Sequence, residues 1–378
     1  MKHIHALFCF LPLSTLSTGA LAQESRSGLD LRATISGEAV YSRELPDASR
    51  NGAHVTGGIR AVFYPEWKIS SHWAVSGAIQ VNSLSSFDED SSTHASGIRS
   101  RFLQAQLGYY RVWKGGSLVI RAGQMQSAFG NFLLHYDDAK NPLLGTPAQY
   151  NYDGAGVTTL GLAGIEAMAT RGKWDARAQF TNSSPANPRS VFDRDQYANW
   201  TGGLGYSVWQ GLRAGISTYR GPYLDRNHLS SFLREARSRD LPATAWGADV
   251  EWARGHWSVT GEWQRFILPQ PVLPWIQQTA AYADAQFVLH PRWYIAARAG
   301  FRHANQTQNP GEETYEVTVG FRPYASQLIK AGYVLERSRT GDLHHTLALQ
   351  FITTIHPFFL CFGKHPVNLS ITHKSSAL

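Results

Sequence analysis

The sequence predicts an all-β protein, a transmembrane antiparallel β-barrel of about 16 strands, with roughly 14 to 18 as the range. Three observations support this fold class. Apolar and polar residues alternate along many short segments, short and long connections alternate between these segments, and tryptophans gather at the segment ends. A soluble β-propeller or β-sandwich gives no reason for the second regularity.

The composition excludes several other classes of protein. The chain has 378 residues, of which 43% are hydrophobic and 17% are charged, so it is not a disordered or low-complexity chain. Mean hydropathy is −0.28, and beyond the N-terminal segment no apolar run approaches the ~18 to 20 residues of a membrane helix. The formal net charge of +7 is spread along the chain without a basic block, so nucleic-acid binding is not expected.

The first residues are typical of a secretory signal peptide. Lys2 begins a weakly basic start, positions 6–16 form an apolar run, and a small-residue A-x-A pattern ends at Ala22, so we expect cleavage before Gln23. An uncleaved anchor is the alternative, although the apolar run is short for a membrane span. The predicted organisation is a signal peptide at 1–22, an outer-membrane barrel at 23–354 and a disordered C-terminal tail at 355–378.

The individual strands follow from a sequence period of two. Between Leu29 and Tyr41, apolar residues fall on one face and polar residues on the other, whereas a helix would place them all round its axis. The same pattern returns along the chain in segments close to the ~9 to 11 residues that a tilted strand needs to cross a bilayer. In order, the predicted strands are 29–41, 55–64, 72–82, 98–112, 117–125, 157–170, 174–182, 199–208, 212–220, 244–253, 257–266, 279–289, 293–302, 313–322, 327–336 and 344–354.

The connections between the predicted strands alternate in length. Short links occupy 113–116, 171–173, 209–211, 254–256, 290–292 and 323–326. Long links occupy 42–54, 83–97, 126–156, 182–198, 221–243, 267–278 and 303–312. Short periplasmic turns and long extracellular loops are the asymmetry of outer-membrane barrels, and an even strand count puts both termini at the periplasmic edge.

Tryptophan placement indicates two belts at the membrane surfaces. Indole combines an apolar body with one N–H donor and prefers the headgroup boundary. Three tryptophans lie near the ends of strands at the long links: Trp200, Trp246 and Trp263. A clearer set lies at or beside the short links: Trp67, Trp73, Trp113, Trp174, Trp209, Trp252, Trp257 and Trp293.

The solvent requires the sheet to close, and the strand number predicts a wet interior. An unpaired backbone N–H finds no water in hydrocarbon, so an open sheet edge is not viable. About sixteen strands leave an aqueous lumen, whereas eight fill their own interior. Basic and acidic residues that face inward nearly balance, which favours modest selectivity for small hydrophilic solutes. The lumen-facing candidates are Arg121, Arg177, Arg298, Arg302, Asp249, Glu251 and Glu262.

The longest link, 126–156, is the candidate pore constriction. A loop of ~30 residues with this apolar content is expected to pack rather than to extend into solvent. We predict that it folds into the lumen, with Phe129, Asp137, Asp138 and Lys140 as its functional residues and Lys140 offsetting one carboxylate. An extracellular lid is the alternative.

One segment carries a resemblance to a known family. The sequence RAGQMQSAFGNF, from Arg121 to Phe132, resembles the strand-then-loop segment of outer-membrane porins in the phosphate-selective porin O and P superfamily. There a Gly-Gln or Gly-Lys pair ends a strand, and Phe-Gly follows in the loop on the constriction side. The resemblance implies a channel in the outer membrane. The Lys- and Arg-rich funnel of phosphate-selective members is not visible here, so phosphate selectivity is not implied.

No catalytic or metal motif stands out. The sequence contains no G-x-S-x-G, H-E-x-x-H or Walker A pattern. His344 and His345 are neighbours in a strand and face opposite sides, so they cannot chelate one ion together. We therefore expect no enzyme activity, metal or cofactor. The alternatives are an adhesin or structural barrel with a plugged lumen, and a barrel enzyme with a site at the rim.

The predicted partners follow from the predicted location. They are outer-membrane lipids and lipopolysaccharide, the barrel-assembly machinery and small hydrophilic solutes. A homotrimer is one assembly to test.

Overall fold

The computed structural model describes residues 28–43, 54–83, 97–132, 137–150, 161–182, 198–223, 241–270, 274–306 and 310–355. The expected signal peptide and nearly all of the expected C-terminal tail lie outside these ranges. Within them, Ile355 is the last residue of the last strand.

The described residues form sixteen strands and one short 3-10 helix, as the alternating pattern predicts. The strands are β1 (Gly28–Ser42), β2 (Val55–Lys68), β3 (Trp73–Ser83), β4 (Ile98–Trp113), β5 (Gly116–Met125), β6 (Leu162–Arg171), β7 (Trp174–Thr181), β8 (Asn199–Trp209), β9 (Leu212–Pro222), β10 (Pro242–Arg254), β11 (Trp257–Leu268), β12 (Ile276–His290), β13 (Trp293–Ala304), β14 (Gly311–Phe321), β15 (Gln327–Ser338) and β16 (Leu343–Ile355). The 3-10 helix η1 (Ala148–Tyr150) lies between β5 and β6.

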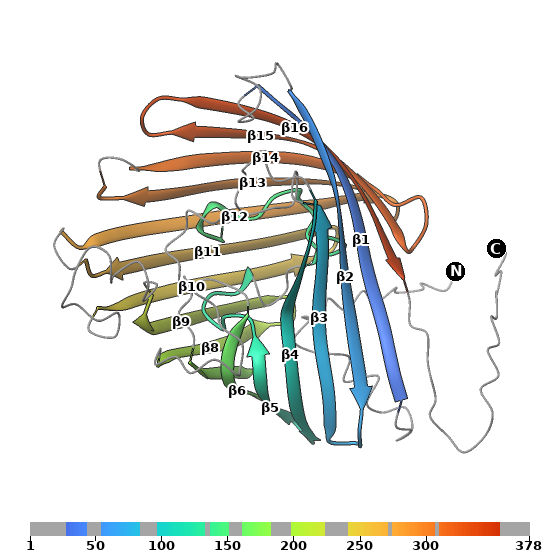
Figure 1. Ribbon diagram of the computed structural model, residues 1–378, viewed down its shortest axis with the longest axis vertical. Coiled ribbons are helices and arrows are strands. Elements are labelled where there is room, and N and C mark those ends of the chain that lie inside the picture. Colours follow the sequence, from blue (N-terminus) through green and yellow to red (C-terminus); the bar gives the residue numbers. More distant parts are fainter. Residues whose placement is uncertain are drawn as a thin grey trace.

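Each strand pairs antiparallel with its neighbours in sequence, and β1 pairs with β16 to close the barrel. In that seam, Ala33 lies opposite Ile355 and Ser42 lies opposite Thr346. Figure 1 shows the strands of the near and far walls crossing at a steep angle, because closure tilts every strand relative to the barrel axis. Closure leaves the sheet without an open edge, which confirms the predicted architecture.

The two faces of the wall differ in chemistry. In β14 the exposed Tyr315, Val317 and Val319 point outward, whereas the buried Glu316 and Thr318 point inward. The same parity runs around the ring, and the outer surface carries many exposed large hydrophobic side chains. An apolar exterior and a polar interior are the reverse of a soluble protein and are typical of a barrel surrounded by lipid.

Short turns gather at one edge of the barrel, which also holds the start of β1 and the end of β16. The turn between β6 and β7 consists of Gly172 and Lys173, and Gly172 has φ +61°, a conformation that glycine adopts readily. Exposed tryptophans at strand ends mark this edge: Trp73, Trp113, Trp174, Trp209, Trp257 and Trp293. Others mark the opposite edge: Trp200, Trp246, Trp263 and Trp275. No helix among the described residues is long and apolar enough to cross a membrane.

Candidate functional site

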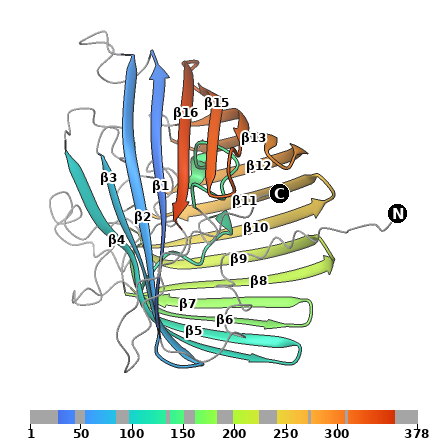
Figure 2. The same ribbon diagram turned by 90° about the vertical axis from the view of Figure 1, so that its right-hand side faces the viewer.

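The chain between β5 and β6 enters the barrel. Figure 2 shows this segment, coloured teal to green, inside the ring of strands. The structure describes its residues 126–132 and 137–150, which we call the inner loop. The inner loop contacts inward side chains near the middle of several strands, such as Ser36 of β1, Glu262 of β11 and Glu316 of β14. It therefore crosses the lumen at about mid-height.

Phe129 provides the apolar contact that starts the inner loop. Its side chain is completely buried, and its ring centroid lies 6.4 Å from that of Tyr219 and 5.7 Å from that of Phe266, both edge-on. Edge-to-face geometry is the favourable arrangement for aromatic pairs. This aromatic cluster from β9 and β11 holds the start of the loop, and a second buried apolar cluster, of Leu143 with Tyr294, Leu328 and Ile352, holds its middle.

The crowding around position 130 requires a glycine there. Its φ is +75°, and an added Cβ would collide with the side chains of Tyr150, Glu262 and Gln264. The backbone of Gly130 is held on both sides: its N–H donates to Ser217 Oγ at 3.2 Å, and its carbonyl accepts from Arg177 Nη2 at 2.6 Å. In the Phe-Gly pair of the sequence, Phe129 thus makes an apolar contact, and Gly130 lets the backbone approach the wall closely.

Glu262 accepts hydrogen bonds from both described parts of the inner loop. Its carboxylate accepts from the backbone N–H of Asn131 at 3.1 Å and from the phenol of Tyr150 at 2.7 Å. Gln264 donates to the same phenol oxygen at 2.8 Å. Burial, followed by the negative charge of Glu262, raises the pKa of Tyr150 well above its ordinary value, so the phenol stays protonated as a donor.

Asp137 fixes the far side of the inner loop to β1 and β2. Its carboxylate accepts from Thr34 Oγ1 at 3.2 Å and from the phenol of Tyr64, and it caps its own turn by accepting from the N–H of Ala139 at 2.8 Å. A buried carboxylate with several donors is a satisfied structural group.

Asp138 makes the charged part of the same contact. Its carboxylate accepts from Ser36 Oγ at 2.6 Å and from Arg60 Nε at 3.0 Å, and it forms an ion pair with Arg60. Burial alone would raise its pKa, but the charges of Arg60 and Lys330 and the hydrogen bond from Ser36 outweigh burial, so the pKa lies below its ordinary value. The group is therefore ionised at neutral pH.

A third set of contacts holds the middle of the loop against β13, β14 and β15. Lys330 Nζ donates to the carbonyls of Asp138 at 2.8 Å and Leu143 at 2.9 Å. Glu316 accepts from the N–H of Leu144 at 2.5 Å, and Arg298 donates to the carbonyl of Gly145 at 2.8 Å. Wall charges thus satisfy loop backbone groups that would otherwise be buried without partners.

Most inward charges on the wall are paired with neighbours. On β9, the inward Arg213 lies 2.7 Å from Asp175 and 2.6 Å from Asp249. Further ion pairs along the inner wall include Arg32–Glu66 at 3.6 Å, Arg121–Glu166 at 3.7 Å, Arg298–Asp284 at 2.7 Å, Arg298–Glu316 at 3.7 Å and Arg302–Glu312 at 3.5 Å. Each predicted lumen-facing residue lies on this inner face, and Glu251 is also 3.7 Å from Arg213.

Water reaches part of this surface. The side chains of Arg32, Asp175 and Glu251 keep 42%, 32% and 33% of their exposure although they face inward. Lys140 is the exposed charge of the inner loop, whereas Asp137 and Asp138 are buried. Burial, the charge of Asp137 and the nearby charge of Arg32 act together on Lys140, and burial dominates, so its pKa is lowered.

The sequence did not identify every residue that positions the loop. Asn131, Tyr150, Tyr64 and Gln264 were not predicted as site residues. The period of two already turns Tyr64 and Gln264 inward, so their side of the wall was readable. Their contact with a loop more than 70 residues away was not. No cluster of three or more metal-ligating side chains occurs among the residues that the structure describes.

No protein-family model and no curated protein matches the chain. Its fold is similar to solved porin structures. OmpF from Salmonella typhi in complex with daunomycin is 9% identical, covers 86% of this chain and 97% of its own, and has a TM-score of 0.59. An anion-selective porin from Comamonas acidovorans is 9% identical, with 87% and 100% covered and a TM-score of 0.58. The trimer form of OmpT from Vibrio cholerae is 9% identical, with 87% and 100% covered and a TM-score of 0.57.

At these identities the comparisons describe the fold alone. The chain has the sixteen-stranded barrel fold of outer-membrane porins. The comparisons do not single out the phosphate-selective porin O and P superfamily, so that finer resemblance stays a prediction.

Proposed function

We propose that the protein is a porin-like channel in the outer membrane through which small hydrophilic solutes or ions diffuse passively. The inner loop narrows the lumen at mid-height, and the channel is weakly selective. The proposal includes no catalytic step and no cofactor.

The observation that carries this proposal is the contrast between the loop and the wall beside it. The loop's own carboxylates, Asp137 and Asp138, are buried in contacts with the wall, while inward charges such as Asp175 and Glu251 keep about a third of their exposure. The loop covers part of the wall, where Glu262, Arg298 and Lys330 are buried, but a plug would cover Asp175 and Glu251 as well. A loop docked on its own contacts, next to hydrated wall, is the arrangement of a constriction rather than a plug.

Weak selectivity follows from the pairing of inward charges. The following arginines of the inner wall each lie within 4 Å of a carboxylate: Arg32, Arg60, Arg121, Arg213, Arg298 and Arg302. Opposite charges this close produce little net field at the distance of a passing ion. Selectivity for one anion would need a ladder of unpaired basic groups.

The outer surface supports the membrane location. Bands of exposed Val, Ile, Leu and Phe lie between the two tryptophan belts, which matches a bilayer core flanked by headgroups. Lipids, lipopolysaccharide and the barrel-assembly machinery are the partners that such a location entails. A homotrimer is the assembly to test first, since the solved OmpT structure above is a trimer.

The test is conductance in planar bilayers, with graded neutral sugars in liposome swelling to define the size limit. Wild type should give open channels with weak ion preference. Deletion of 133–149 should raise conductance and admit larger sugars. The charges of Lys330, Glu316 and Arg298 that the deletion uncovers would face lumen water, so the barrel itself should still form.

The control is the heat-modifiable shift on SDS gels, which reports a closed barrel in both proteins. A folded deletion protein with an unchanged sugar limit would contradict a constriction by the inner loop. A wild-type protein that folds, inserts and never conducts would contradict the channel and favour a structural barrel.

A further inference from the structure

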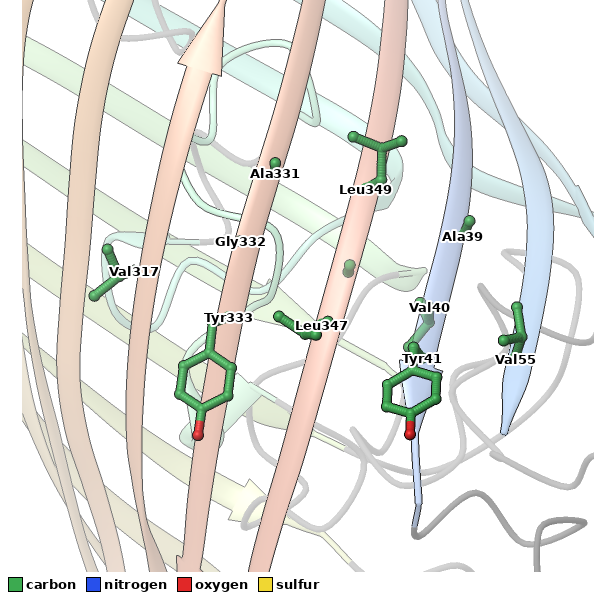
Figure 3. A pocket seen from close by; sticks show the side chains of 11 residues that line it. Ala39, Val40, Tyr41, Val55, Val317, Ala331, Gly332, Tyr333, Leu347 and Leu349 are labelled. Carbon is green, nitrogen blue, oxygen red and sulfur yellow. The ribbon is translucent and has the colours of Figure 1, made fainter. Parts of the chain in front are cut away.

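A groove of about 520 Å³ lies on the outer face across β14, β15, β16, β1 and β2. The registers of the paired strands place five of its residues in a single row around the barrel. Figure 3 shows this row: Val317, Tyr333, Leu347, Tyr41 and Val55. We call it the tyrosine row.

The floor of the groove lies in the next row toward the short-turn edge. There Ala331 is opposite Leu349, Leu349 is opposite Ala39, and Ala39 is opposite Gly57. Ala331 and Ala39, with methyl side chains, are low points on either side of the exposed Leu349, and all three line the groove. Val55, at one end, is 66% exposed and forms a side wall. The lining is apolar and open to the exterior of the barrel.

The groove has a polar end at the long-loop edge. The rings of Tyr41 and Tyr333 both extend toward that edge (Figure 3), and the phenol of Tyr333 lies 2.6 Å from Nδ1 of His345. Arg43 follows Tyr41 by two residues, and Arg337 lies four residues beyond Tyr333 in β15, at a position that also faces outward. Both arginines are exposed.

We propose that this groove is a binding site for a lipid with a phosphorylated headgroup, such as the lipid A part of lipopolysaccharide. An acyl chain lies along the groove lining formed by Ala331, Leu349 and Ala39. The phosphates lie at the level of Arg43 and Arg337. Tyrosine favours the boundary between acyl chains and headgroups, and the tyrosine row sits between the two regions. Arginine binds phosphate through paired N–H donors.

The charge at the polar end decides between occupants. Glu313 of β14 lies opposite Arg337 on the same face and offsets part of its charge. A second copy of this chain would place apolar outer wall against the groove and would add nothing to offset Arg43. A phosphorylated lipid fills the apolar floor and supplies the opposite charge in one molecule. The inference rests on the outer-membrane location in the proposed function, but not on conduction.

Filling the floor tests the acyl-chain contact. In native mass spectrometry of the full chain in detergent with added diphosphoryl lipid A, A39W and A331W should each weaken binding roughly ten-fold, the effect of about two methylenes losing their burial. A248W is the matched control, because Ala248 is an exposed outward residue of β10, away from the groove. It should bind as wild type does.

Removing the charges tests the headgroup contact. R43A and R337A should each weaken binding about five-fold, the contribution of one basic residue near an anionic lipid surface. Both should also reduce the preference for diphosphoryl over dephosphorylated lipid A. R220A is the control, since Arg220 is an exposed residue of β9 outside the groove. The heat-modifiable shift confirms that each variant is folded.

Three outcomes would overturn the inference. Equal binding of lipid A by A39W, A331W and A248W would contradict the acyl-chain site. Equal loss of binding in R43A, R337A and R220A would mean that the arginines attract anionic lipid only through the general charge of the barrel. A loss of oligomer mass in A39W and A331W with lipid binding unchanged would identify a second copy as the occupant. Conductance of the same preparations separates these results from the channel proposal, because a silent barrel that still binds lipid A would refute only the channel.

Discussion

Lys330 and Leu143 are joined by a hydrogen bond of 2.9 Å from the ammonium to the backbone carbonyl, and the lysine is completely buried. The same ammonium donates to the carbonyl of Asp138 at 2.8 Å. A strand of the wall therefore supplies two donors to the backbone of a loop almost 190 residues earlier in the chain. This contact replaces the water that an uncovered lysine and two loop carbonyls would bind.

The first prediction concerns this contact. K330M keeps much of the side-chain length but leaves the carbonyls of Asp138 and Leu143 without their donor. Each buried acceptor left unpaired costs about 1–3 kcal/mol, so the loop should loosen. We expect a lower midpoint in the heat-modifiable shift and noisier single-channel current. K114M, at an exposed position of the short turn after β4, should match wild type. Equal behaviour of the two variants would contradict a role for Lys330 in holding the loop.

The fold was readable from the sequence because local and global signals agree. The alternation along 313–322 required one wet and one apolar face, and β14 places Glu316 inward and Val317 outward accordingly. Strand ends were less readable. The prediction stopped the second strand at residue 64, whereas β2 continues to Lys68. Pro65 lies within this extension, and a proline inside a run argues against a strand.

The candidate site was readable only in part. Phe129, Asp137, Asp138 and Lys140 were predicted as one group because the chain joins them. Which wall residue each meets depends on how the loop crosses the lumen, and that path leaves no periodic signal. The sequence indicated Asp137 and Asp138 as functional residues of the constriction loop. The structure surrounds both carboxylates with donors from β1 and β2, so their contacts attach the loop to the wall.

The second prediction concerns Gly130. G130A adds a Cβ at φ +75°, against Tyr150, Glu262 and Gln264. Backbone strain of this kind costs on the order of 1–3 kcal/mol, and the crowding adds to it. The expected result is a loop that no longer docks beside Glu262, seen as a larger sugar size limit in liposome swelling. G172A, at an open short turn with φ +61° and no atom near the added Cβ, controls for strain alone. A larger limit in G172A as well would assign the effect to the barrel and not to the loop.

The third prediction concerns acid. The pKa of Asp138 is lower in the folded protein than the ordinary value of about 3.9, so its pairing with Arg60 stabilises the docked loop at neutral pH. This contribution is complete above the unfolded pKa and is lost as pH falls through the folded pKa. We expect conductance steps to stay constant down to about pH 4 and to change only below it. D138N should lack this acid transition. A transition in wild type near pH 6 would contradict Asp138 as its source.

The last prediction concerns the net field in the channel. Among the described residues, Lys140 has no carboxylate within ion-pair distance, while most inward arginines do. Its ammonium is therefore the least offset charge of the inner loop, and solutes that pass the loop meet it. K140Q should shift the reversal potential in a salt gradient toward cations by roughly two- to four-fold in permeability ratio, the effect of one charge at ~5 Å in a water-like dielectric. The shift should shrink as salt rises from about 0.1 to 1 M, because the screening length falls from ~10 to ~3 Å. K114Q, which removes the same charge at the short-turn edge, should leave the ratio unchanged. If the two variants shifted it equally, the preference would arise from the total charge of the barrel, and Lys140 would lose its place at the constriction.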